Sequence, residues 1–254
     1  MSPFVGEIIG TAILILLGNG VVANVVLNET KGNNSGWIVI TMGWGMAVFT
    51  AVYVVGQFSG AHINPAVTVG LAAAGMFDWA MVGPYIGAQM IGAFIGAVLV
   101  WLAYKDHFAT TEDGPAKLAV HSTGPAIRNI PSNFMTETIG TFMLVFGVFY
   151  LVSPGFIGAD GELLEAISIG GQEVGFGLGS LAALPVGLLV LAIGLSLGGP
   201  TGYAINPARD LGPRIAHAIL PIPNKGSNDW GYSWVPVIGP IVGGLLAALL
   251  YGLL

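Results

Sequence analysis

The sequence predicts an all-α membrane protein with six spanning helices and two shorter helices that enter the bilayer without crossing it. The first observation is composition: 54% of the 254 residues are hydrophobic, 8% are charged, and the mean hydropathy is +0.82. Soluble domains carry about 25% charged residues. The second is a set of six apolar runs, each long enough to span a bilayer. The third is an Asn-Pro-Ala tripeptide that occurs twice, each time before a shorter apolar run.

Composition also excludes several classes of function. There are no cysteines, which rules out disulfides and thiolate metal sites, and the net charge of −6 argues against nucleic-acid partners. The N-terminus lacks a basic region and a small-residue cleavage site, so a spanning helix is expected there rather than a signal peptide. The four histidines are dispersed, and no nucleophile–base pair, metal-ligand group or cofactor motif is visible. We therefore expect no enzyme activity, no metal and no cofactor.

The apolar runs give the order of the elements. Runs of spanning length, about 20 residues, cover approximately 4–27, 37–58, 82–104, 134–154, 182–198 and 233–254. Two shorter runs begin at Pro65 and Pro207 and end near residues 77 and 220. At 1.5 Å per residue each is ~20 Å long, too short to cross alone. A half-spanning helix is entered through a non-helical segment at membrane depth. Such a segment is tolerated only where protein or a water-filled cavity surrounds it.

An internal repeat relates the two halves. Glu7-Ile8-Ile9-Gly10-Thr11 returns as Glu137-Thr138-Ile139-Gly140-Thr141, and Asn64-Pro65-Ala66 returns as Asn206-Pro207-Ala208. Pro84, Gly87 and Gly92 likewise match Pro236, Gly239 and Gly244. We predict one domain with repeat one at about 1–104, a connector at 105–133 and repeat two at about 134–254. Three crossings per half invert the second copy, so the two short helices meet at their N-termini near the midplane.

Two polar segments and the loop charges complete the outline. The connector 105–133 joins the halves, and segment 155–181 is glycine-rich and acidic, with carboxylates at Asp160, Glu162, Glu165 and Glu173. We expect a solvated loop there, with a gating role as the alternative. If the N-terminus is inside, the outer loops contain Lys31, Lys105, Lys117, Arg128 and Lys225. The positive-inside rule disfavours that orientation.

The paired motifs have a chemistry of their own. Proline suits the first position of a helix, and the asparagine before it can cap the helix with its side-chain oxygen. Two opposed N-termini make the midplane electropositive, which disfavours cations. Asn64 and Asn206 could then offer amide N–H groups to a passing oxygen and interrupt a proton wire. Backbone carbonyls before the motifs would form a ladder of acceptors that replaces hydration: Gly60, Ala61, His62, Gly202, Tyr203 and Ala204.

Three ionisable residues lie at membrane depth. Glu7 and Glu137 occupy matching repeat positions. We favour a bracing role for them, as acceptors for backbone N–H groups of the irregular loops, over a role as protonation sites of a coupled transporter. Arg209 follows the second motif, and its five donors and permanent charge suit a pore lining that binds oxygens and repels cations. A salt bridge with the adjacent Asp210 is compatible with that role.

These residues carry a family resemblance. With Ser59-Gly60-Ala61-His62-Ile63-Asn64-Pro65-Ala66-Val67-Thr68 and Asn206-Pro207-Ala208-Arg209-Asp210, the chain resembles the aquaporin (major intrinsic protein) family over nearly its whole length, and within it the glycerol-facilitator branch. The resemblance implies six spanning helices plus two half-helices, a pore in each subunit and a homotetramer. It also implies a multi-pass protein of the cell membrane with cytoplasmic N- and C-termini, against the Lys/Arg loop count.

The resemblance further implies a selectivity filter formed by Trp44, Gly194, Tyr203 and Arg209. Water-selective members have histidine where Gly194 stands, so glycine is expected to leave the ring wide. Glycerol facilitators commonly have phenylalanine where Tyr203 stands, so its hydroxyl is expected to make the ring more polar or slightly narrower. Five further positions are similar to those of glycerol channels: Tyr104, Asp210, Arg214, Pro236 and Val237.

The expected function is a passive channel for glycerol and other small neutral solutes, with some water, that excludes protons and ions. Candidate further solutes are dihydroxyacetone, urea, hydrogen peroxide and protonated lactic acid. The alternative from another class is a secondary transporter that couples a small solute to protons through Glu7 or Glu137, since inverted repeats and broken helices also occur in transporters.

Overall fold

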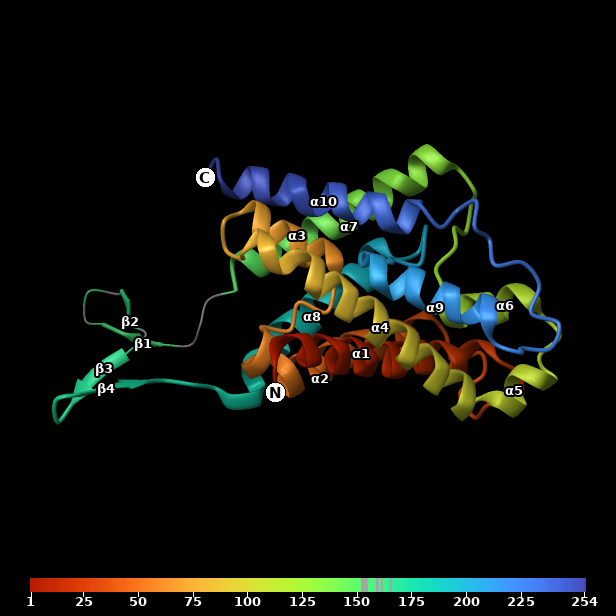
Figure 1. Cartoon of the computed structure of the whole chain (residues 1–254), viewed down its shortest axis with the longest axis horizontal. Coiled ribbons are helices and arrows are strands. Elements are labelled where there is room, and N and C mark those ends of the chain that lie inside the picture. Colours follow the sequence, from red (N-terminus) through yellow and green to blue (C-terminus); the bar gives the residue numbers. More distant parts are fainter. Residues whose placement is uncertain (152–154, 159, 161, 165) are drawn as a thin grey trace.

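The structure, a computed structural model, describes residues 1–151, 155–158, 160, 162–164 and 166–254. Glu165 of the predicted acidic loop lies outside the described residues, as do residues 152–154 at the end of the fourth predicted span. The described part is a bundle of long helices with a small β-structured arm at one end (Figure 1). The all-helical prediction for the membrane part is confirmed.

Six helical segments match the predicted spans. They are α1 (Pro3–Val26), α2 (Trp37–Ser59), α4 (Trp79–Ala103), α7 (Ile130–Phe149), η1 with α8 (Gly179–Ala183 and Leu184–Leu197) and α10 (Val235–Tyr251). The fourth predicted span is displaced, because α7 begins at Ile130 rather than 134. Asn129 caps it by accepting a hydrogen bond from the Ser132 N–H, and a proline in the first turn favours the start.

Two short helices follow the Asn-Pro-Ala motifs, as predicted. They are α3 (Pro65–Ala73) and α9 (Pro207–Ile219), with 9 and 13 residues. Asn64 caps α3 and Asn206 caps α9, each through its side-chain oxygen. The first is shorter than expected, because Gly75 (φ 74°) adopts the left-handed conformation that commonly ends a helix.

The two halves interlock. In the first half α1 packs against α2 and α4, and in the second α7 packs against α8 and α10. The short helices cross over: α3 lies against α10 of the second half, and α9 lies against α4 of the first. Close approach needs glycine at two matching crossings, since a Cβ on Gly92 would lie 2.3 Å from the Ile8 carbonyl oxygen and one on Gly243 would lie 2.3 Å from that of Thr138.

The two polar segments are more structured than the sequence suggested. The connector contains α5 (Lys105–Thr110) and α6 (Gly114–His121), both at the end of the bundle opposite the chain termini (Figure 1). The acidic segment forms two antiparallel strand pairs, β1 (Phe156–Ile157) with β2 (Leu163–Leu164) and β3 (Ala166–Ile169) with β4 (Gln172–Gly175). This arm projects from the end where both termini lie (Figure 1).

Candidate functional site

Both approaches to the Asn-Pro-Ala motifs are strained in the same way. Left-handed φ angles occur at Gly60 (77°), Ala61 (51°) and Ile63 (44°), and again at Gly202 (82°), Tyr203 (37°) and Ile205 (44°). Residues other than glycine adopt this region at a cost of ~1–3 kcal/mol each, so surrounding contacts must hold them there. The predicted carbonyl ladder therefore lies on two matching, irregular and strained segments.

Glu7 holds the first of these segments. It is fully buried, and one carboxylate oxygen accepts hydrogen bonds from the Ser59 hydroxyl (2.7 Å) and the His62 N–H (3.0 Å). The other accepts from the Ile63 N–H (2.7 Å) and the Gln89 amide (2.7 Å). Four donors on one buried carboxylate compensate its loss of hydration.

Glu137 holds the second segment in the same manner. One oxygen accepts from the Thr201 hydroxyl (2.7 Å) and the Ala204 N–H (3.0 Å), and the other from the Ile205 N–H (2.9 Å). These are the loop contacts that a bracing residue requires. In both halves the carboxylate is engaged through both oxygens, which ties the shape of the irregular segment to the first helix of its own repeat.

The two motifs are bonded to each other across the centre of the molecule. The side-chain nitrogen of Asn64 donates to the Ile205 carbonyl (2.8 Å), and that of Asn206 donates to the Ile63 carbonyl (2.8 Å). Each amide nitrogen carries two hydrogens, so one N–H per asparagine remains. Both asparagines line the central cavity. The sequence did not predict this reciprocal pairing, and it takes up the two carbonyls that directly precede the motifs.

Two cavities meet at a ring of side chains. The central cavity, of about 210 Å³, extends from this ring past the motifs to Leu71 and Leu151, and a second cavity extends from the ring to Thr123. Of the residues that the structure describes, three line both cavities: Trp44, Tyr203 and Arg209. The Arg209 guanidinium carbon lies 4.1 Å from the centroid of the Trp44 ring, a cation–π contact. Three of the four predicted filter residues thus surround the junction of the cavities.

The fourth predicted filter residue has a different geometry from the one expected. Gly194 is not among the described residues that line either cavity. A Cβ at this position would lie 2.8 Å from Cζ of Tyr203, because the tyrosine ring covers the glycine. Gly194 therefore makes room for Tyr203 and does not leave an open gap. A second contact fixes the same ring, since Trp37 packs edge-on against it with centroids 5.8 Å apart.

The Tyr203 hydroxyl also differs from expectation. Its oxygen is buried and has no hydrogen-bond partner in the described part of the chain. The hydroxyl is therefore shielded from both cavities, so the expected gain in polarity from this oxygen is absent from the ring in this structure. An unpaired buried hydroxyl is a cost to stability.

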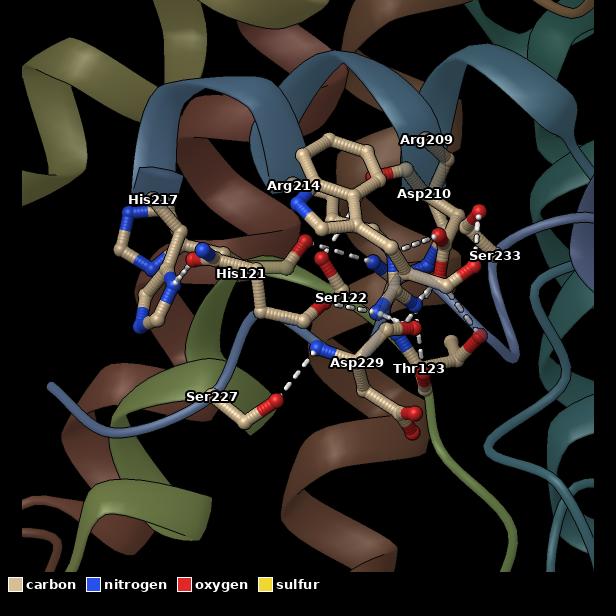
Figure 2. A network of polar contacts seen from close by, with 12 residues as sticks. His121, Ser122, Thr123, Arg209, Asp210, Arg214, His217, Ser227, Asp229 and Ser233 are labelled. Atoms are coloured by element: carbon tan, nitrogen blue, oxygen red, sulfur yellow. Dashed lines mark hydrogen bonds and ion pairs between the residues drawn. The ribbon is translucent and has the colours of Figure 1, made fainter. Parts of the chain in front are cut away.

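A buried network behind the ring links α9 to the connector. Figure 2 shows its members beside Arg209. Asp210 pairs with Arg214 one turn later (2.8 Å), and both side chains are fully buried. Asp210 also accepts from the N–H and hydroxyl of Thr123 (2.7 and 2.8 Å), and Arg214 donates to the Thr123 carbonyl (2.9 Å). The considered salt bridge between Arg209 and Asp210 is not formed, because neighbouring residues on a helix point in different directions.

Within the described part of the chain, Arg209 instead has two acceptors from other elements. Its Nη1 donates to the Asn19 side chain (3.5 Å) and to the His121 carbonyl (3.4 Å). Sequence reasoning missed Asn19, although an amide in the middle of the first apolar run was a visible signal. It also missed Gln89 and Trp37, whose roles depend on contacts between distant elements.

The remaining glycerol-branch positions lie away from the ring. Tyr104 caps the end of α4 and its ring lies 5.9 Å from that of His107. Pro236 and Val237 belong to the first turn of α10. Asp210 and Arg214 are thus the two of the five positions that contribute directly to the network behind the ring.

Comparisons with known proteins identify the family of the chain. The family model of the major intrinsic protein matches residues 1–251. The probable glycerol uptake facilitator protein of Thermotoga maritima is 57% identical over 251 residues, covering 99% of this chain and 98% of the relative. The glycerol uptake facilitator protein of Streptococcus pneumoniae strain R6 is 53% identical over 253 residues, covering 100% and 99%.

A solved structure has the same fold. The X-ray structure of the aquaglyceroporin from Plasmodium falciparum superposes with a TM-score of 0.79 at 32% identity, covering 98% of this chain and 93% of that one. The resemblance that the paired motifs indicated is therefore confirmed over the whole length of the fold. The chain belongs to the major intrinsic protein family.

Proposed function

We propose that this protein is a passive membrane channel for glycerol and other small neutral solutes, with some permeation of water. The observation that carries the proposal is the junction of the two cavities at Trp44, Tyr203 and Arg209. The names of the two bacterial relatives and of the Plasmodium falciparum channel support the same solute class. No catalytic step is required for this function.

The ring is amphipathic in the way that a polyol requires. Trp44 and Tyr203 offer two aromatic faces to the carbon edge of glycerol, while Arg209 offers guanidinium N–H groups to its hydroxyls. Further along, carbonyls of the strained segments accept from those hydroxyls, and the remaining amide N–H groups of Asn64 and Asn206 donate to them. Without such replacement, dehydrating three hydroxyls would cost several kcal/mol.

Exclusion of protons and cations follows from charge. Arg209 places a permanent positive charge at the ring, and the N-termini of α3 and α9 add a positive potential at the motifs. A water held by either asparagine donates outward, so a continuous chain of proton transfer is interrupted. Neutral solutes pass the same site, because they carry no net charge that Arg209 and the helix N-termini would repel.

The proton-coupled alternative has no support. Glu7 and Glu137 each accept from donors on both oxygens, and these donors hold the strained loops. A carboxylate that carried a proton through each cycle would have to break these contacts each time. We therefore propose that the two residues brace the loops and do not transport protons.

We further propose that the range of solutes includes dihydroxyacetone, urea, hydrogen peroxide and protonated lactic acid, and that the channel is a homotetramer in the cell membrane. We place both termini in the cytoplasm. Two of the five cations that oppose this orientation have local partners: Lys225 donates to three carbonyls at the end of α9, and Arg128 pairs with Asp229.

Stopped-flow measurements on proteoliposomes test the proposal. Glycerol, urea and lactic acid at pH 4 and pH 7 are applied as osmolytes, with water efflux into sucrose measured in parallel. We expect a glycerol flux that rises linearly with concentration and does not depend on a proton or sodium gradient. A flux that saturates at low turnover, or requires such a gradient, would refute the channel.

A further inference from the structure

Asn19 lies beside the filter but outside the lumen. It belongs to α1 and is fully buried, yet it is not among the described residues that line either cavity. Its side-chain oxygen accepts from Nη1 of Arg209 (3.5 Å), and its side-chain nitrogen donates to the His121 carbonyl (3.4 Å). The same carbonyl accepts from Nη1 of Arg209 (3.4 Å). The three groups form a closed triangle.

We propose that Asn19 is a positioning residue of the filter, which holds the Arg209 guanidinium against Trp44 and thereby sets the preference of the pore for glycerol over water. The inference rests on the proposed channel function and adds to it a residue that does not touch the solute. Asn19 acts through Arg209, on the side of the guanidinium that faces away from the lumen.

Only an amide satisfies this site. The position must accept from a guanidinium and donate to a carbonyl at the same time, and asparagine does both without a charge. An aspartate would lose the donor and place a negative charge against Arg209, which reduces the positive potential of the ring. A leucine of similar size would leave the Arg209 N–H with the His121 carbonyl alone.

The arrangement leaves the rest of the guanidinium for the solute. Among the described residues, the acceptors for the Arg209 side chain both bond Nη1. Arg209 lines both cavities, so its other N–H groups remain for hydroxyls that pass through the ring. A guanidinium fixed by one nitrogen and by the Trp44 face (4.1 Å) has lost much of its rotamer freedom before the solute arrives.

The internal repeat supplies an independent argument. The offset that relates Glu7 to Glu137 relates Asn19 to Phe149, and the offset of the Asn-Pro-Ala motifs relates Arg209 to Val67. Phe149 packs against Tyr251 with ring centroids 4.8 Å apart. The half-site without an arginine thus also lacks the buried amide. Asparagine and arginine therefore occur together at one of the two repeat-related sites and are both missing from the other. This difference indicates that Asn19 serves Arg209 and not the helix packing that both halves have in common.

The test compares Asn19→Leu and Asn19→Asp with a matched control, Asn133→Leu. Asn133 is also a buried asparagine whose amide bonds backbone groups, namely the Ile127 carbonyl (3.1 Å) and the Asn129 N–H (3.0 Å), but it is not among the described residues that line the cavities. Glycerol and water permeabilities are measured in proteoliposomes, and proton leak is followed with an enclosed pH dye.

For Asn19→Leu we expect glycerol permeability to fall ~5-fold while water permeability changes by less than about twofold, since a lost hydrogen bond to a charged group raises the barrier for the solute that uses that group. Asn19→Asp should raise the proton leak. Asn133→Leu should leave the glycerol-to-water ratio unchanged. A double variant with Arg209→Val should show no additional effect of Asn19→Leu on that ratio.

Two outcomes would overturn the inference: a wild-type ratio in folded Asn19→Leu, or an equal change of the ratio in the Asn133→Leu control. If Asn19→Leu does not fold, the isosteric Asn19→Asp decides, and an unchanged ratio and leak in that variant refute the role. Failure of the wild-type protein to conduct glycerol would instead refute the proposed function.

Discussion

Gly194→Ala is a small change with a large predicted effect on the filter. The added Cβ would lie 2.8 Å from Cζ and 3.0 Å from Cε2 of Tyr203, and 3.0 Å from Cγ2 of Thr41. Carbon atoms prefer separations of about 3.5–4.0 Å. The Tyr203 ring must therefore move away from residue 194 by ~0.7 Å or more, and we expect it to move into the space of the two cavities that Tyr203 lines. Overpacking of this kind costs ~1–3 kcal/mol.

The assay is the ratio of glycerol to water permeability in proteoliposomes. If ~1 kcal/mol of this strain adds to the activation free energy of glycerol permeation, glycerol permeability falls about 5-fold. The permeability of the smaller water molecule should fall less. Replacing the ring removes the cause, so Tyr203→Ala combined with Gly194→Ala should behave like Tyr203→Ala alone. The proposed coupling of glycine and ring is wrong if the glycerol permeability of Gly194→Ala equals that of the wild type. It is also wrong if Gly194→Ala lowers the glycerol permeability as much in the Tyr203→Ala background as in the wild type.

Three other predictions concern the ring and the buried network behind it. Asp210→Asn leaves Arg214 buried without a carboxylate and should lower stability by ~3–5 kcal/mol, seen as a lower Tm in detergent. Burial lowers the pKa of His121 from 6.5 to about 3, so the unfolded chain binds a proton below pH ~6.5 while the folded chain stays neutral until pH ~3. Stability should therefore decline over that window, by ~2 kcal/mol at pH 5, and His121→Phe, which keeps the backbone carbonyl, should show a smaller drop of Tm between pH 7.5 and pH 5. Arg209→Val should raise cation and proton leak in dye-loaded vesicles, and an unchanged leak would contradict the charge barrier.

Local signals in the sequence predicted the elements that matter most. Proline after a capping asparagine fixed the starts of α3 and α9 at the predicted residues, because both effects depend on neighbours in the chain. The inverted repeat predicted that these starts meet. The i, i+4 spacing of Asp210 and Arg214 on a helix is also a local signal for the buried ion pair that they form. The sequence instead suggested the adjacent Arg209 as the partner of Asp210.

What could not be predicted depends on contacts between distant segments. The covering of Gly194 by Tyr203 requires the relative position of α8 and a strained loop, which no local pattern specifies. The bonds of Asn19 join α1 to α9 and to the end of α6. The strands of the acidic arm pair through short stretches whose glycine-rich sequence predicted only a loop.

The reciprocal bonds between the two motifs have a consequence for how fast solutes can pass. Each half of the molecule supplies the cap of its own short helix and donates from that same cap to the loop of the other half. These two hydrogen bonds hold the halves together at the point where a rocking motion would have to separate them. A pore whose centre is held in this way has a fixed opening, so its rate of transport is set by diffusion through the ring and not by the rate of a conformational change. The activation energy of glycerol flux should accordingly remain low, close to that of diffusion in water.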